Sequence, residues 1–206
     1  ISNLDSFKPI SAIGKDNYEW FFKKVALVPF TTHELNMIGE LEWDRAVVLE
    51  QISLNKHKKI AIPAIPSSAA EQVKNEANDE RQVRQFYAEQ GILSQPQTLK
   101  HYLNAPLPAY LAPIKWLGVT DDLTGPSRVD EDGYSYVPEP HNKLPYFYAA
   151  NARDARAGIV HEGAHYQQLA ISWRHERVLR RYYYDSGVNE GIAFYNEELL
   201  LAAGLF

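Results

Sequence analysis

The sequence contains no cysteine and a single methionine, Met37. The absence of cysteine excludes disulfide bonds and thiolate metal ligands, so a zinc site here has to use histidine and carboxylate side chains. The longest apolar runs, such as residues 198–206, are too short to cross a membrane. The first ten residues lack the pattern of a signal peptide. We therefore expect a soluble protein without a membrane span, and these absences are compatible with any compartment.

The charge balance leans slightly acidic, with 21 Lys and Arg against 26 Asp and Glu and a formal net charge of −5. Nucleic acid is not expected as a partner, because phosphate binding needs a basic surface. A length of 206 residues with 45% hydrophobic residues suits one domain with a sizeable core. The chain begins without methionine and its last residues, 199–206, resemble the middle of a helix. We expect a fragment of a longer protein.

Helices are predicted in the first half from capping signals and apolar periodicity. Residues 15–27 form a short helix that Pro29 ends. Thr31 with Glu34 has the form of a capping box and opens a helix that runs to about residue 55. Ser68 with Glu71 opens another, which runs to residue 90 and stops at Gly91. Proline-rich residues 91–114 predict short helical turns at best, and residues 118–133 predict a loop.

A change of period after this loop predicts a small sheet. Residues 134–137 and 144–148 are rich in aromatic and β-branched residues and indicate two strands of an antiparallel hairpin. The helical pattern returns after residue 154 and continues to the end, with a break at residues 185–187. We predict a mainly α fold with a small antiparallel sheet (α+β). It would form one catalytic-type domain, residues 1–206, with a helical part to 117 and the hairpin and metal-ligand helices in 118–206.

The motif that carries chemistry is HEGAH at residues 161–165. Histidines four residues apart lie one turn apart on the same face of a helix, close enough to share a metal ion, and Glu162 lies beside them. A catalytic zinc site needs a third protein ligand and an open position. Glu190, near the start of the next predicted helix, supplies a carboxylate. His161, His165 and Glu190 are therefore the predicted zinc ligands, and Glu162 is the predicted general base.

The sequence fits three other interpretations less well. The same motif can occur on an exposed helix without function, but apolar neighbours such as Ile159 and Val160 indicate a buried helix. A di-iron bundle needs two Glu-x-x-His motifs, and residues 162–165 provide the only one. Asp130–Gly133 lacks the spacing of a calcium loop and is better explained as a solvated turn.

Several stretches resemble the bacterial DUF885 family of zincin-like proteins. The two most specific read GIVHEGAHYQQLAISW and RRYYYDSGVNEGIAFYNEELLLAAGLF, and weaker ones read IGKDNYEWFF, ELEWDRAVVLEQ and GVTDDLT. The resemblance covers nearly the whole chain and implies the C-terminal half of a gluzincin-like fold, a zinc site, and a hydrolase or peptidase role. It implies the same three ligands and Glu162 as the base. Many members have two more residues between the histidines, so substrate contacts near the shorter HEGAH are in doubt.

The expected reaction is hydrolysis of a peptide or small amide by zinc-activated water. Candidates for supporting roles lie near the ligands: Tyr183 as donor to the anionic intermediate, with Arg181 nearby; Glu197, seven residues after Glu190, as orienter of a ligand histidine; and Gln168 and Tyr195 as pocket-lining residues. Ordinary helix packing, or a charge exposed to solvent, explains the presence of each of these residues equally well. A zinc hydrolase of non-peptide esters or amides and an inactive metal-binding module stay open as alternatives. Missing substrate-binding parts could come from a partner chain or a homo-oligomer.

Overall fold

The computed structural model describes residues 12–117, 121–182 and 186–206. It divides into two compact units, an N-terminal unit up to Ala61 and a C-terminal unit from Ile62 onward. The prediction of a single domain with a helical part to residue 117 stays a prediction. Each unit is described by itself below.

In its described residues, 12–61, the N-terminal unit contains two helices, α1 (Lys15–Lys24) and α2 (Thr32–His57). Both were predicted, although α1 ends three residues earlier than expected. The capping box at the start of α2 is present: the Glu34 amide donates to Thr31 Oγ1, and the Thr31 amide donates to Glu34 Oε2 at 2.7 Å. Neither helix contains a buried residue. A local capping signal therefore accounts for the start of α2, and the Thr32 amide and hydroxyl also donate to Glu19 of α1.

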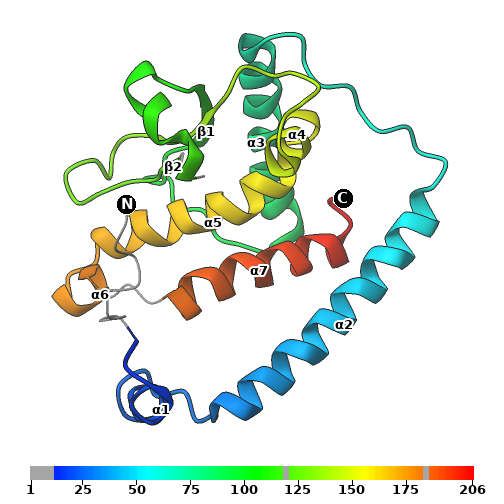
Figure 1. The fold of residues 1–206 in the computed structure, drawn as a ribbon. Helices are drawn as coiled ribbons and strands as arrows, with labels where there is room; N and C mark the ends of the chain where they lie inside the picture. Colours follow the sequence, from blue (N-terminus) through cyan, green and yellow to red (C-terminus); the bar gives the residue numbers. More distant parts are fainter. Residues whose placement is uncertain (1–11, 118–120, 183–185) are drawn as a thin grey trace, which may run out of the picture. The chain divides into compact units, whose positions relative to one another are not determined.

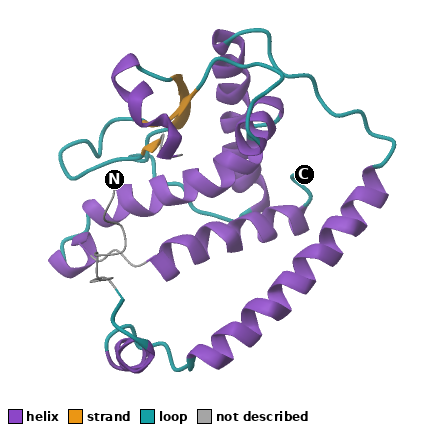
Figure 2. Ribbon diagram, in the orientation of Figure 1, coloured by secondary structure: helices purple, strands orange, loops and turns teal. Residues whose placement is uncertain are grey.

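The C-terminal unit is mainly helical with a small sheet, which confirms the α+β class (Figures 1 and 2). Its elements follow the order α3 (Ala69–Gln90), β1 (Tyr102–Pro106), the 3-10 helix η2 (Ala109–Leu117), β2 (Asp121–Asp122), β3 (Gly133–Val137), α4 (Tyr146–Arg153), α5 (Arg156–Trp173), α6 (Val178–Tyr182) and α7 (Ser186–Ala203). The Ser68 side chain caps α3, and Gly91, in the left-handed conformation with φ 62°, ends it as predicted.

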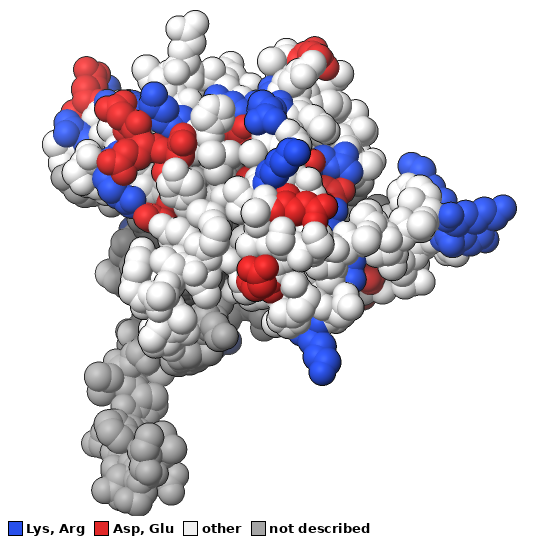
Figure 3. All heavy atoms as spheres, turned by 90° about the horizontal axis from the view of Figure 1, so that it is seen from above, with Lys and Arg blue, Asp and Glu red and all other residues white. Residues whose placement is uncertain are grey.

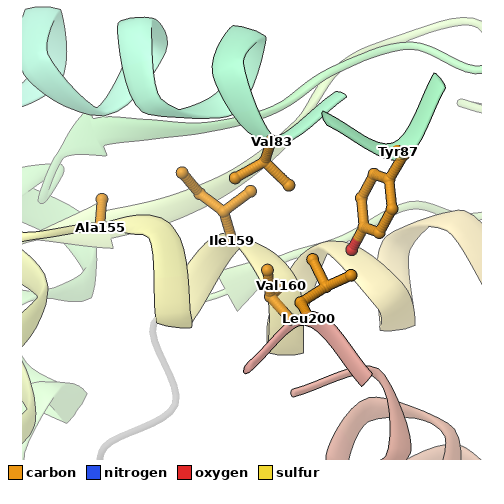
Figure 4. Packing of buried hydrophobic residues seen from close by; sticks show 6 residues of the cluster. All are labelled: Val83, Tyr87, Ala155, Ile159, Val160 and Leu200. Carbon is orange, nitrogen blue, oxygen red and sulfur yellow. The ribbon is translucent and has the colours of Figure 1, made fainter. Parts of the chain in front are cut away.

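The core of this unit lies where α3, α5 and α7 meet. Figure 4 shows six of its buried side chains, contributed by all three helices: Val83, Tyr87, Ala155, Ile159, Val160 and Leu200. The buried Asn196 of α7 donates to Tyr87 Oη at 2.6 Å and to the Val160 carbonyl at 2.8 Å. These bonds satisfy the Asn196 side-chain amide inside the core and fix the position of α7 along the axis of α5.

The sheet is mixed, so the predicted antiparallel hairpin is wrong. Its order is β1-β3-β2, with β1 parallel and β2 antiparallel to β3. The first predicted strand corresponds to β3, but the second, residues 144–148, overlaps helix α4. Pro145 lies at the N-cap of α4 with φ −53°, a value suited to a helix start. The aromatic run after it favours strands only weakly, and the helix prevails because such propensity depends on context.

The other two strands lie in segments where the sequence predicted turns or a loop. Gly133, the first residue of β3, shows why this sheet can sit close to α5. A Cβ atom there would come within 2.5 Å of the Tyr166 ring and 2.7 Å of the Leu123 carbonyl oxygen. Only glycine allows this approach.

The surface carries charges of both signs. Figure 3 shows Asp and Glu side chains interspersed with Lys and Arg on the face that it presents. None of the helices in the described ranges has the length and apolar character of a membrane span.

Candidate metal centre

The predicted ligands lie on two helices that pack side by side, α5 and α7 (Figure 1). Apolar contacts between Val160 and Leu200, with the Asn196 bond to the Val160 carbonyl, set the register of α7 against α5. Residues 161 and 165 then face α7 from successive turns of α5. Local helix geometry and one packing interface therefore suffice to bring the three predicted ligands together.

His161, His165 and Glu190 each place a ligating atom within 4.8 Å of the other two. Glu190 Oε2 is 3.3 Å from His161 Nε2 and 3.5 Å from His165 Nε2. The side chain of His165 is buried, with 5% exposed, whereas that of Glu190 is 49% exposed. His165 therefore lies on the buried side of the cluster, and Glu190 lies on its solvent-exposed side.

These distances fit a tetrahedral metal ion. With metal–ligand bonds of about 2.0–2.1 Å, two ligand atoms of a tetrahedron lie roughly 3.3 Å apart. Both imidazole–carboxylate distances, 3.3 and 3.5 Å, agree with that spacing. Two imidazoles and one carboxylate are also a donor set that catalytic zinc sites use. The residues present therefore suit zinc, although the same cluster could accept another divalent cation.

Glu197 contacts the other nitrogen of a predicted ligand. Its Oε1 lies 2.5 Å from His161 Nδ1, on the opposite side of the ring from Glu190. This hydrogen bond is the main reason why the pKa of His161 is raised. A carboxylate on Nδ1 fixes both the ring orientation and the tautomer, leaving Nε2 free to bind a metal.

The second histidine has the opposite electrostatic character. Burial lowers the pKa of His165, and the neighbouring charge of His161 lowers it further. The rings of the two histidines meet edge to face with centroids 4.9 Å apart. The nearby negative charge of Glu190 partly offsets the decrease in pKa. His165 is thus neutral near pH 7, the form that binds metal.

Glu162 stands beside both histidines without touching either closely. Its carboxylate oxygens are 3.9 Å from His161 Nε2 and 3.9 Å from His165 Nε2. Burial, followed by the charge of Asp121, raises the pKa of Glu162 to about 7. A carboxyl group with this pKa can both accept and release a proton near neutral pH.

The remaining predicted site residues are spread more widely. Arg181 donates to the Glu176 carbonyl at 2.9 Å, and Gln168 is half-buried on α5. Tyr195 is 65% exposed. Tyr183 lies outside the described residues. None of these placements assigns a function to the side chain.

The sequence prediction missed Tyr102 and Asp121. Tyr102 Oη donates to Asp121 Oδ1 at 2.8 Å. The charge of Asp121 raises the pKa of Glu162, and the charge of Glu162 in turn raises the pKa of Tyr102. Tyr102 lies in a segment predicted as turns and Asp121 in a predicted loop. No spacing signal could have joined them, because the sheet brings them together across β3.

Comparisons with protein-family models, curated proteins and solved structures find no match for this chain. The resemblance to the DUF885 family therefore stays a prediction from the sequence.

Proposed function

We propose that the protein is a zinc-dependent hydrolase with a gluzincin-like site that cleaves peptide or small amide bonds. The observation that carries the proposal is the convergence of His161 and His165 from α5 with Glu190 from α7. The sequence motif alone requires only the two histidines to share a helix face. The arrival of a carboxylate from a different helix, at distances suited to a tetrahedral ion, is an independent requirement of such a site.

The side chains have distinct roles in this proposal. A zinc ion held by the three ligands would make water more acidic and would polarise the substrate carbonyl. In this proposal Glu162, whose carboxylate lies 3.9 Å from both imidazoles, accepts the proton of the attacking water and delivers it to the leaving amine. Glu197 holds the His161 ring through Nδ1 and keeps its Nε2 directed at the site.

The DUF885 resemblance supports the same ligands and the same base, and it motivates the proposed fold family. In that scheme Tyr183 remains the proposed donor to the anionic intermediate. Gln168, Arg181 and Tyr195 remain candidates for lining the substrate site.

The decisive experiment combines metal analysis with turnover of the full chain. We expect about one zinc per chain, and zinc-dependent hydrolysis of a short-peptide library. Glu162→Gln should retain zinc and reduce turnover by about 10²–10⁴-fold, since it removes only the base. His165→Ala should lose zinc. Glu198→Gln is the matched control, because this exposed carboxylate lies on α7 next to Glu197.

Two results would contradict the proposal. A chain that binds no zinc at micromolar concentrations has no such site. A chain that binds zinc but hydrolyses nothing is the inactive metal-binding module. Hydrolysis of esters with no hydrolysis of peptides would keep the zinc mechanism and change the substrate class.

A further inference from the structure

One face of the sheet brings a carboxylate from outside the motif toward Glu162. Residues directly opposite each other on paired strands share a face, as do residues two apart on one strand. Tyr102 pairs with Gly133, and Asp121 pairs with Ser135, two residues further along β3. Tyr102 and Asp121 therefore project from the same face of the sheet.

This face is turned toward α5. A Cβ atom on Gly163 would be 3.8 Å from the Tyr102 ring, and Gly163 directly follows Glu162. The rings of Tyr102 and Tyr166 have centroids 6.5 Å apart. The Tyr102 side chain thus lies against α5 beside Glu162, and its hydroxyl holds Asp121 there through the 2.8 Å hydrogen bond.

Asp121 differs in its partners from its neighbour Asp122. Asp122 forms a two-pronged ion pair with Arg128, with distances of 2.5 and 2.9 Å. Within the described residues no lysine or arginine pairs with Asp121, and its contact with Tyr102 uses only Oδ1. Tyr102 is 5% exposed, so its ring is fixed and orients the carboxylate. A carboxylate has two oxygens, so Oδ2 can accept a hydrogen bond from a ligand while Oδ1 accepts the one from Tyr102.

The surroundings of Asp121 are rich in negative charge. Three carboxylates, those of Glu162, Glu190 and Glu197, lie at the candidate metal centre, and the negative charge of a fourth, Asp121, acts on Glu162. One dication balances only two of them. A ligand that brings a positive charge close to Asp121 would relieve the remaining repulsion, whereas a ligand carboxylate there would increase it.

We propose that Asp121, oriented by Tyr102, binds the protonated α-amino group of the substrate. The enzyme would then act on short peptides with a free N-terminus, removing the first residue as an aminopeptidase or dipeptidase does. An α-amino group has an ordinary pKa near 8 and is cationic at neutral pH. This inference rests on the proposed function and adds the class of substrate to it.

The test compares one short peptide with its Nα-acetyl analogue, using the zinc-loaded full chain. The ratio of kcat/KM for the free peptide over the acetylated one should be at least about tenfold at pH 7, since a charged hydrogen bond is involved. It should fall as the pH rises through the amine pKa. Asp121→Asn should lower the ratio about tenfold, and Tyr102→Phe should lower it less. Asp122→Asn, whose carboxylate is paired with Arg128, should preserve it.

A binding experiment supplies a readout without turnover. Calorimetry on zinc-loaded Glu162→Gln should show about tenfold tighter binding of the free peptide than of the acetylated one. The double variant Glu162→Gln with Asp121→Asn should bind both equally. Equal hydrolysis of both peptides by the parent chain, or a ratio that Asp121→Asn leaves intact, would overturn this inference while the hydrolase proposal stands. The absence of zinc-dependent hydrolysis of every peptide in the library would overturn this inference together with the proposed peptide substrate.

Discussion

The two units of the chain build their helices from different sources of stability. In the N-terminal unit, α1 and α2 contain no buried residue, and α2 begins at a capping box. In the C-terminal unit, α3 and α5 contribute the buried side chains of one core, and α7 adds Leu200 to it. The candidate metal centre lies in the second unit. A site that needs atoms placed within a few tenths of an ångström requires elements that packing holds in register.

The largest expected effect comes from opening the core of the C-terminal unit. Leu200 is completely buried, so Leu200→Ala should lower the free energy of unfolding by about 2–5 kcal/mol. Leu41→Ala on α2, where the leucine is 67% exposed, is the matched control and should change it by less than about 0.5 kcal/mol. Urea unfolding followed by circular dichroism measures both. Similar losses for the two variants would erase the contrast between the units.

Zinc should stabilise only one of the units. At a free zinc concentration about 100 times the dissociation constant, the C-terminal unit should gain about 2.7 kcal/mol. Hydrogen exchange should slow along α5 and α7 and stay unchanged along α2. The raised pKa of His161 means that a proton must leave before zinc binds, so the gain should shrink as the pH falls.

The variant His165→Ala is the control for the zinc experiment, because it removes a buried side chain that is one of the proposed ligands. It should abolish the zinc-induced protection. Protection that spreads equally over α2, or that survives this substitution, would place the bound metal elsewhere.

A buried carboxyl group makes the C-terminal unit sensitive to pH. Glu76 of α3 is 1% exposed, and its Oε2 accepts the Asn104 amide at 2.7 Å. Burial raises its pKa from 4.5 to about 7, and the charges of Glu80 and Asp79 add to the increase. Between these two values the folded state binds more protons than the unfolded state. Stability therefore falls as the pH rises from about 4.5 through about 7.

Glu76→Gln removes this titration while keeping an acceptor for Asn104. The difference between 4.5 and about 7 corresponds to about 3 kcal/mol, so above pH 8 the variant should be more stable than the parent by about 1–3 kcal/mol. The advantage should vanish near pH 4.5. Unfolding free energies measured across this range test the sign, and a variant that gains nothing at high pH would show that Glu76 is already accommodated as an anion.

The features that the sequence could predict depend on local interactions, and the features that it could not predict depend on non-local ones. The starts of α2 and α3 and the stop at Gly91 were predicted because capping depends on residues three or four positions apart. The pairing of His161 with His165 was predicted for the same reason. Glu190 could be proposed because its helix, α7, follows α5 closely along the chain, with only the short α6 between them.

The sheet could not be predicted in this way. Strand β1 pairs with β3 across about thirty residues, and β2 contains only Asp121 and Asp122. No periodic pattern can indicate a strand of two residues, and parallel pairing leaves no turn signal in the sequence. Tyr102 and Asp121 were missed because their proximity depends entirely on this sheet. The proposed substrate preference therefore depends on Tyr102 and Asp121, the two residues that the sequence could not place beside Glu162.

The smallest expected effect concerns a local signal of the N-terminal unit. Thr31 Oγ1 accepts the Glu34 amide at 3.2 Å and donates to Glu34 Oε2 at 2.8 Å. Thr31→Ala removes both bonds and should destabilise the first turn of α2 by about 1 kcal/mol. This free energy corresponds to roughly fivefold faster amide exchange at Glu34 and Leu35. Thr31→Ser keeps the hydroxyl and should exchange like the parent. Because α2 has no buried residue to compensate for a lost cap, unchanged exchange in Thr31→Ala would mean that interactions other than local capping stabilise this helix.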